Sequence, residues 1–291
     1  MREYCLRAYA KVNLTMDVLY RRVDGYHEVD LLMQSVGLCD ELTVREGRGL
    51  GLTIDGGLAV EDNNLVLRAA RLLAQEAGIE PNAQMHLIKR IPVAAGLGGG
   101  SADAAAAFVG LNRLWNLNFP ESVLLHLGAR LGADVPFCIA GGCCRATGIG
   151  TELEAVHGCL PPLHLVILKP CEGLLTREIF GGLHLDQHTR HPDTVGAALA
   201  VEKGDVQALI ACMGNVLETP ALERRPQIAR ALEELMEAGA LHARMSGSGS
   251  AVFGLFATQM AAKQAAERLG KTYAECFAAD FAQQGVEFIS E

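Results

Sequence analysis

The sequence predicts an α+β fold with two domains, and three observations support this prediction. The chain has 291 residues, half of them hydrophobic, which is enough to bury the cores of two ordinary domains. A glycine-rich stretch in the first half separates a predicted strand from a predicted helix. In the second half, helix and strand patterns alternate, as in α+β layer folds. The prolines Pro161 and Pro162 mark the predicted boundary, so we expect domains over residues 1–160 and 161–291.

The first 91 residues carry mainly strand patterns, with one helix among them. β-forming residues and partial alternation predict one or two strands over residues 4–20 and further strands over residues 28–54. Apolar residues at helical spacing, followed by Gly78, predict a helix over residues 63–77. A strand over residues 84–91 leads into the glycine-rich stretch, which therefore connects a strand to a helix.

Beyond the glycines, helices become more frequent. The segment after Lys271 has no pattern that we can assign. The elements predicted in chain order are helices over residues 101–115 and 121–131, a strand pair over 142–156, a buried strand within 163–170, a short element over 176–180, helices over about 192–203, 205–217 and 226–238, a strand over 251–256 and a helix over 258–269.

Composition and charge exclude several classes of protein. A formal net charge of −9 argues against nucleic acid as a partner, because nucleic-acid-binding proteins usually carry a basic face. The sequence has no apolar run long enough to span a membrane and no secretory signal pattern, so we expect a cytoplasmic protein that does not use a membrane. Its nine cysteines lack the spacing of a zinc site and are expected to be reduced thiols.

Four glycines within five residues precede Ser101 and a run rich in alanine. Glycine permits tight turns and close approach, and alanine favours helix, so this stretch predicts a loop leading into a helix with Ser101 as its N-cap. The N–H groups at a helix N-terminus are suited to binding phosphate. The simpler alternative is a turn before a core helix. Neither a Walker A motif nor a dinucleotide GxGxxG motif matches, so any phosphate loop here is of another type.

Three features fit phosphoryl transfer if they share one site. The first is Lys11 with Asn13, which are two positions apart and so point to the same face of a strand. The others are the loop over residues 96–101 and Asp134 within an apolar segment. Singly, a lysine on a strand is usually a solvated charge and a lone aspartate is usually a turn or N-cap residue. Together they supply a phosphate cradle, a positive charge and a carboxylate that accepts the proton of an alcohol.

Two aromatic residues and a second glycine loop are further candidates for ligand binding. Tyr26 and Phe180 are most simply core or rim residues, but as a pair they could stack on a planar ring, with His27 at the edge of that ring. The loop over residues 246–249 is by itself a flexible turn. In a kinase it would close over the acceptor or the phosphates.

A resemblance to a known family narrows the choice of function. The stretch PVAAGLGGGSADAAA resembles the glycine loop of the superfamily of galactokinase, homoserine kinase, mevalonate kinase and phosphomevalonate kinase. AKVNLTMDVLYRRVDGYHEVD, LNRLW, GADVPF and MSGSGSAVF, in this order over residues 10 to 253, are similar to the signatures of the 4-diphosphocytidyl-2-C-methyl-D-erythritol kinases. The DGYH stretch is the most discriminating, because the sister families lack it.

The resemblance implies an ATP-dependent kinase, with Mg²⁺, that phosphorylates the 2-hydroxyl of a cytidyl alcohol on the methylerythritol phosphate route to isoprenoids. It implies an N-terminal ATP-binding domain like domain 2 of ribosomal protein S5, and a C-terminal ferredoxin-like domain for substrate binding and closure. The enzyme could be a monomer or a homodimer, and the metal ligands stay unassigned. The implied site residues are Lys11 and Asp134 for catalysis, Asn13, Tyr26, His27, Thr176 and Phe180 for substrate binding, and Pro92, Val93, Ala94, Ala95, Gly96, Leu97, Gly98, Gly99, Gly100, Ser101 and Ala102 for ATP binding.

The chain departs from the family pattern at two positions, and two other functions stay open. Ala102 stands where many members have a second serine, and Ala251 follows Ser250 where proline and threonine are usual. One alternative is a sister kinase acting on mevalonate or homoserine, which lacks a ring to stack. The other is a nucleotide-binding sensor without catalysis, which would have no need of both Lys11 and Asp134.

Overall fold

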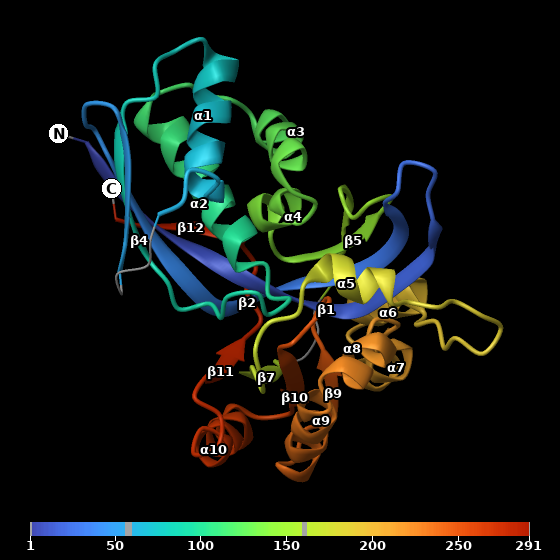
Figure 1. Cartoon of the computed structure of the whole chain (residues 1–291). Coiled ribbons are helices and arrows are strands. Elements are labelled where there is room, and N and C mark those ends of the chain that lie inside the picture. Colours follow the sequence, from blue (N-terminus) through green and yellow to red (C-terminus); the bar gives the residue numbers. More distant parts are fainter. Residues whose placement is uncertain (1, 56–59, 159–161, 291) are drawn as a thin grey trace.

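The computed structural model describes residues 2–55, 60–158 and 162–290, and its centre is a large mixed sheet. Two 19-residue strands, β1 and β2, pair antiparallel along their length and form a long curved ribbon (Figure 1). The strand order is β12-β1-β2-β4-β3, with β5 pairing with β2 and β6, and β8 pairing parallel with β1. The strands of this sheet are β1 (Glu3–Arg21), β2 (His27–Arg45), β3 (Leu50–Ile54), β4 (Ala83–Ile88), β5 (Cys143–Thr147), β6 (Glu152–Ala155), β8 (Gly214–Asn215) and β12 (Val286–Ser290).

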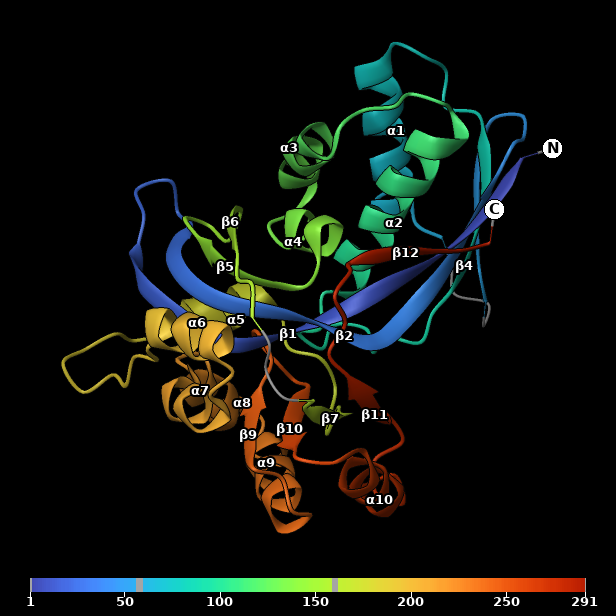
Figure 2. The same cartoon turned by 180° about the vertical axis from the view of Figure 1, so that it is seen from behind.

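Four helices gather on one side of this sheet (Figures 1 and 2). The alanine-rich helix α2 is buried along most of its length, because small side chains allow it to pack closely against the strands and against α1. The helices are α1 (Leu65–Ala77), α2 (Gly99–Leu114), α3 (Glu121–Leu131) and α4 (Val135–Ala140).

A smaller antiparallel sheet with the order β11-β7-β10-β9 forms the second layer of the molecule. Its central strands are nearly continuous runs of buried apolar residues, which fits strands covered on both faces. The elements of this half are β7 (His164–Leu168), β9 (His242–Met245), β10 (Val252–Phe256), β11 (Cys276–Asp280), α5 (Thr176–Gly181), α6 (Thr194–Lys203), α7 (Val206–Cys212), α8 (Glu218–Arg224), α9 (Gln227–Glu237) and α10 (Gln259–Leu269).

The end of the chain returns to the first sheet. After β11, the amide of Ala282 donates a hydrogen bond to the carbonyl oxygen of Ser35, and β12 then pairs antiparallel with β1. The two termini consequently lie near each other (Figure 1). Of the prolines that suggested a domain boundary, Pro161 lies outside the described residues, and the boundary at residue 160 stays a prediction.

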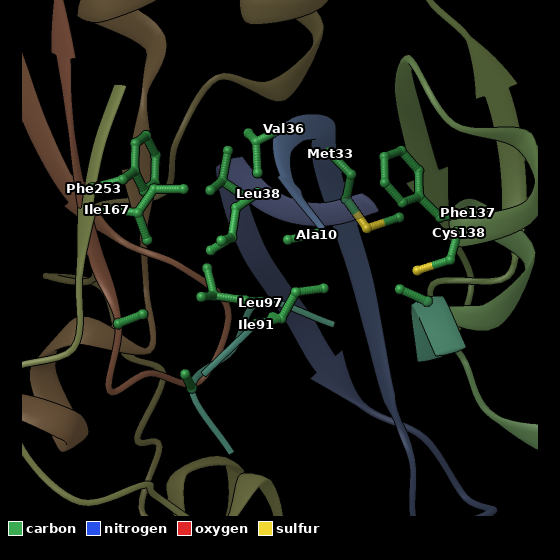
Figure 3. Packing of buried hydrophobic residues seen from close by; sticks show 14 of the residues in the cluster. Ala10, Met33, Val36, Leu38, Ile91, Leu97, Phe137, Cys138, Ile167 and Phe253 are labelled. Atoms are coloured by element: carbon green, nitrogen blue, oxygen red, sulfur yellow. The ribbon is translucent and has the colours of Figure 1, made fainter. Parts of the chain in front are cut away.

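Buried apolar side chains from both sheets form one continuous cluster. Figure 3 shows Ile91 and Leu97 beside Ala10 of β1, within the cluster that also contains Phe137 of α4 and Phe253 of β10. The glycine-rich stretch is therefore anchored in the core of the molecule. The eight cysteines among the described residues are all free, as the sequence predicted for reduced thiols.

The structure confirms the α+β class and corrects some of its predicted elements. Residues 135–140 form a short helix, α4, that the sequence did not indicate, because six residues are too few to show a helical period. The predicted helix over residues 205–217 ends at Cys212, because the chain then enters the two-residue strand β8. Residues 242–245 form strand β9, which the sequence did not indicate.

Candidate active site

The glycine-rich loop is fixed to strand β1 by its backbone and by buried side chains. Ile91, Ala95 and Leu97 are each at most 2 % exposed. The amide of Lys11 donates a hydrogen bond of 3.0 Å to the carbonyl oxygen of Leu97. The loop is therefore packed against β1 beside Lys11.

The second glycine loop, Ser246 to Gly249, packs directly on the first. Gly96 has φ 78°, and a Cβ at this position would overlap the backbone oxygen of Ser246. The hydroxyl of Ser246 donates a hydrogen bond of 2.9 Å to the carbonyl oxygen of Gly96 and accepts one of 3.4 Å from the amide of Asn13. Only glycine fits at position 96, because the turn needs a positive φ and the two loops touch there.

Helix α2 begins two residues earlier than the sequence predicted. Gly98, with φ 71°, is the N-cap residue and has no side-chain cap, and the amide of Ala102 donates the first helical hydrogen bond to its carbonyl oxygen. The prediction of Ser101 as the N-cap is wrong, because Gly99 and Gly100 enter the helix despite their low propensity. Ser101 lies in the first turn, next to N–H groups that have no partner within a helix.

Lys11, Asn13 and Asp134 come together beside this helix start. The Nζ atom of Lys11 donates a hydrogen bond of 2.7 Å to Oδ1 of Asn13, as expected for alternating residues on one strand face. The same Nζ lies 3.6 Å from Oδ2 of Asp134. Lys11 is only 4 % exposed, whereas 37 % of the Asp134 side chain is exposed. A Cβ on Gly98 would lie 3.1 Å from Cγ of Lys11, so the group adjoins the phosphate-loop glycines.

Asp134 occupies the N-cap position of α4, but its side chain does not cap that helix. The simpler interpretation, an N-cap aspartate, would have the carboxylate accept a hydrogen bond from the backbone of the first turn. Instead the carboxylate lies beside the Lys11 ammonium at the surface of the site. Its oxygens are therefore available to a hydroxyl group of a ligand.

The remaining predicted substrate residues lie on the hairpin after β1 and on α5. The hydroxyl of Thr176 is 2.9 Å from that of Ser248, so α5 contacts the second glycine loop. One turn further on, the ring of Phe180 lies 4.9 Å from that of His27, at an interplanar angle of 38°. Burial, with Arg21 nearby, lowers the pKa of His27 and favours the neutral imidazole. Tyr26 is 61 % exposed, so the aromatic contact of Phe180 in this structure is with His27 and not with Tyr26.

Asn215 supports the site and was not found from the sequence. Its Nδ2 donates to the carbonyl oxygens of Met245 and Gly247, at 2.9 and 2.8 Å, and its strand β8 pairs with β1 next to Thr15. Asn215 thereby links the second glycine loop to the strand that carries Lys11. No local pattern identifies it, because its partners are 30 and 32 residues away.

Within the described part of the chain, no group of three or more His, Cys, Asp or Glu side chains could hold a metal ion. None of the helices in these residues is long and apolar enough to cross a membrane.

The fold and the paired glycine loops define the class of protein. The sequence matches the GHMP kinases N terminal domain over residues 64–142 and the GHMP kinases C terminal domain over residues 197–275. The structure is also similar to a homoserine kinase from Cytophaga hutchinsonii, with a TM-score of 0.78 and 20 % identity over 99 % of this chain and 98 % of that one. At that identity the likeness concerns the fold alone, and it agrees with a two-domain GHMP kinase.

Relatives with higher identity narrow the class to one family. A 4-diphosphocytidyl-2-C-methyl-D-erythritol kinase from Pelotomaculum thermopropionicum is 46 % identical, over 91 % of this chain and 93 % of the relative. One from Acetivibrio thermocellus is 40 % identical, over 95 % and 98 %. A crystal structure of a kinase of this name superimposes with a TM-score of 0.82 and 33 % identity, over 97 % of this chain and 99 % of that chain. The chain belongs to the family of 4-diphosphocytidyl-2-C-methyl-D-erythritol kinases.

Proposed function

We propose that this enzyme transfers the γ-phosphoryl group of ATP to the 2-hydroxyl of 4-diphosphocytidyl-2-C-methyl-D-erythritol, a step on the route to isoprenoid precursors. The observation that carries the assignment is the Lys11–Asp134 pair, 3.6 Å apart beside the glycine-rich start of α2, in a chain 46 % identical to a kinase of that name. A phosphate cradle, a cation and a carboxylate are the parts that phosphoryl transfer requires.

In this proposal the oxygen of the substrate hydroxyl forms a bond to the γ-phosphorus, and Asp134 accepts the proton of that hydroxyl. The bond between that phosphorus and the β–γ bridging oxygen breaks, and ADP leaves with the electron pair. Lys11 donates a hydrogen bond to the reacting hydroxyl oxygen and offsets negative charge on the transferred group. Because Asn13 and Asp134 hold its Nζ, the ammonium is oriented before the substrate arrives.

The residues Pro92 to Ala102 would surround the ATP phosphates, with N–H groups of the first turn of α2 directed at them. Mg²⁺ bound to the phosphate oxygens would reduce the charge that the attacking oxygen meets. Because direct transfer requires ATP and the cytidyl alcohol in the site at the same time, we expect a sequential reaction through a ternary complex.

The cytosine ring would bind at Phe180 and His27, on the side of the site where α5 approaches the second glycine loop. A neutral imidazole has one donor and one acceptor, which suits the edge of a pyrimidine base. Tyr26 is exposed on the hairpin and would close over the other face of the ring, and Thr176 would lie near the substrate.

Replacing Phe180 with alanine is expected to raise the KM for the cytidyl substrate about tenfold or more, because stacking and apolar burial of the ring are both lost. The KM for ATP should stay within about twofold, since the Phe180 ring lies against His27 and the phosphates would be held by N–H groups at the start of α2. Steady-state kinetics with each substrate varied in turn measure the two constants. Phe180→Leu is the matched variant and should give an intermediate KM. A rise in the KM for ATP alone would refute the stacking assignment.

The identity of the product tests the proposed reaction. Phosphorus NMR of the reaction mixture should show a new phosphomonoester on the erythritol, with the cytidyl diphosphate signals retained and ADP formed in equal amount. Release of cytidine monophosphate instead would mean that the enzyme attacks the diphosphate, and the proposed function would be wrong.

A further inference from the structure

A buried group of three charged residues lies beneath the proposed phosphate site. Lys89, just after β4, places its Nζ against Oδ2 of Asp40 on β2 and 2.7 Å from Oδ2 of Asp103 on α2. Asp40 is 0 % exposed and Asp103 is 4 % exposed. We call these residues the Lys89 cluster.

The Lys89 cluster connects the strand before the glycine loop to the helix after it. Oδ1 of Asp40 accepts hydrogen bonds from the amides of Arg90 and Ile91, where the loop begins. Asp103 lies four residues, about 6 Å along the helix axis, beyond Gly99. A Cβ on Gly99 would be 3.4 Å from Nζ of Lys89. The charge of this cluster is therefore close to the N–H groups that would bind phosphate.

Asp103 is the unusual member, because its Oδ1 is buried and has no hydrogen-bond partner. Burial, together with the carboxylate of Asp40, raises the pKa of Asp103 to about 8, although Lys89 opposes the rise. Burial alone would lower the pKa of Lys89, but the two carboxylates raise it instead, so Lys89 keeps its charge. With one proton on the two carboxyl groups the cluster is neutral, and without it the cluster carries one negative charge.

The other elements packed on α2 bring few charges toward Asp103. The buried face of α1 is apolar, and Arg90 pairs with Glu41 near the protein surface. On the α4 and β1 sides, Cys138 interacts electrostatically with Asp103 and also with Asp134 and Lys11. Burial raises the pKa of Cys138 far above its usual range, so it stays a neutral thiol. With a pKa of about 8, Asp103 is a group near the loop whose proton can change between neutral and mildly alkaline pH.

We propose that Asp103 is a positioning residue whose proton sets the strength of the ATP site. With the proton in place, the Lys89 cluster is neutral and holds the loop against α2. Loss of the proton puts a negative charge one turn below the phosphates and weakens ATP binding. By reciprocity, ATP binding takes up a proton near pH 8. This inference rests on the proposed function, because it requires that the loop bind the phosphates.

Calorimetric titration of the full-length protein with Mg-ATP tests this inference. At about pH 8, titrations in two buffers of different ionisation enthalpy should show uptake of a sizeable fraction of a proton. The affinity at about pH 9.5 should be about threefold to tenfold weaker than at about pH 7. In Asp103→Asn the proton uptake and the pH dependence should both disappear. The control is Glu41→Gln. Glu41 follows Asp40 in the sequence and pairs with Arg90 near the surface, so this variant should behave like the parent protein.

The outcomes separate the inference from the proposed function. Absence of proton uptake by the parent protein at about pH 8 overturns the inference, and this result does not depend on whether Asp103→Asn folds. Retention of the same pH dependence in folded Asp103→Asn also overturns it, because the titrating group then lies elsewhere. Absence of ATP binding at every pH would instead remove the proposed function, and the inference with it.

Discussion

Replacing Asp134 with asparagine is expected to lower kcat by about 10²–10⁴, the usual contribution of a general base. The amide has nearly the same shape as the carboxylate but cannot accept the hydroxyl proton. Because the Asp134 side chain does not cap α4 and is 37 % exposed, the substitution should leave stability and ATP affinity close to those of the parent protein. Single-turnover kinetics, with ATP affinity measured separately, check both parts.

The control for this experiment is Glu80→Gln, which also removes one negative charge, at an exposed position in the loop before β4. It should retain parental turnover. Parental turnover in Asp134→Asn would mean that another group takes the proton, and the assigned role would have to be abandoned. A loss confined to ATP binding would instead indicate that Asp134 acts on the nucleotide.

Replacing Gly96 with alanine is expected to abolish most activity, because the added methyl group would overlap the backbone oxygen of Ser246. Backbone atoms cannot rotate away as a flexible side chain can, so the two glycine loops must separate. We expect kcat/KM for ATP to fall by at least about 10², because displacement of a binding loop by 1 Å can cost this much. Thermal unfolding and steady-state kinetics measure the two consequences.

Gly78→Ala is the matched control for Gly96→Ala. Gly78 also has a positive φ, 66°, but nothing lies within 4 Å of its Cβ position. It should therefore lose about 1–2 kcal/mol of stability from left-handed strain and keep its activity. If both variants lost activity equally, close approach of the loops would not be the reason that glycine is needed at position 96.

The parts of the fold that sequence predicted well are those with a strong local period. The helix predicted over residues 63–77 is α1 at Leu65–Ala77, and the strand predicted within residues 163–170 is β7 at His164–Leu168. In both segments, burial of one face or of the whole element leaves a regular apolar pattern. The return of β12 to the first sheet was not predicted, because pairing between residues 5–8 and 286–290 leaves no local signal.

The candidate site was predicted in part for the same reason. Alternation on one strand predicted that Lys11 and Asn13 share a face, and the 2.7 Å hydrogen bond between their side chains confirms this. Asp103 was overlooked, although a charged residue among the alanines of a helix is a usable signal of a buried ion group. Ring recognition by Tyr26 and Phe180 with His27 at the edge stays a prediction. The contact between Phe180 and His27 had no local signal, because contacts between a hairpin and a distant helix depend on the tertiary fold.

The choice of acceptor can be measured as ADP release from the purified protein with ATP and Mg²⁺, comparing three alcohols. We expect turnover with 4-diphosphocytidyl-2-C-methyl-D-erythritol and none above background with mevalonate or homoserine. Turnover with mevalonate or homoserine, but not with the cytidyl alcohol, would contradict it. That result would keep Lys11, Asp134 and the glycine loop as kinase machinery and would remove the cytosine site at Phe180 and His27.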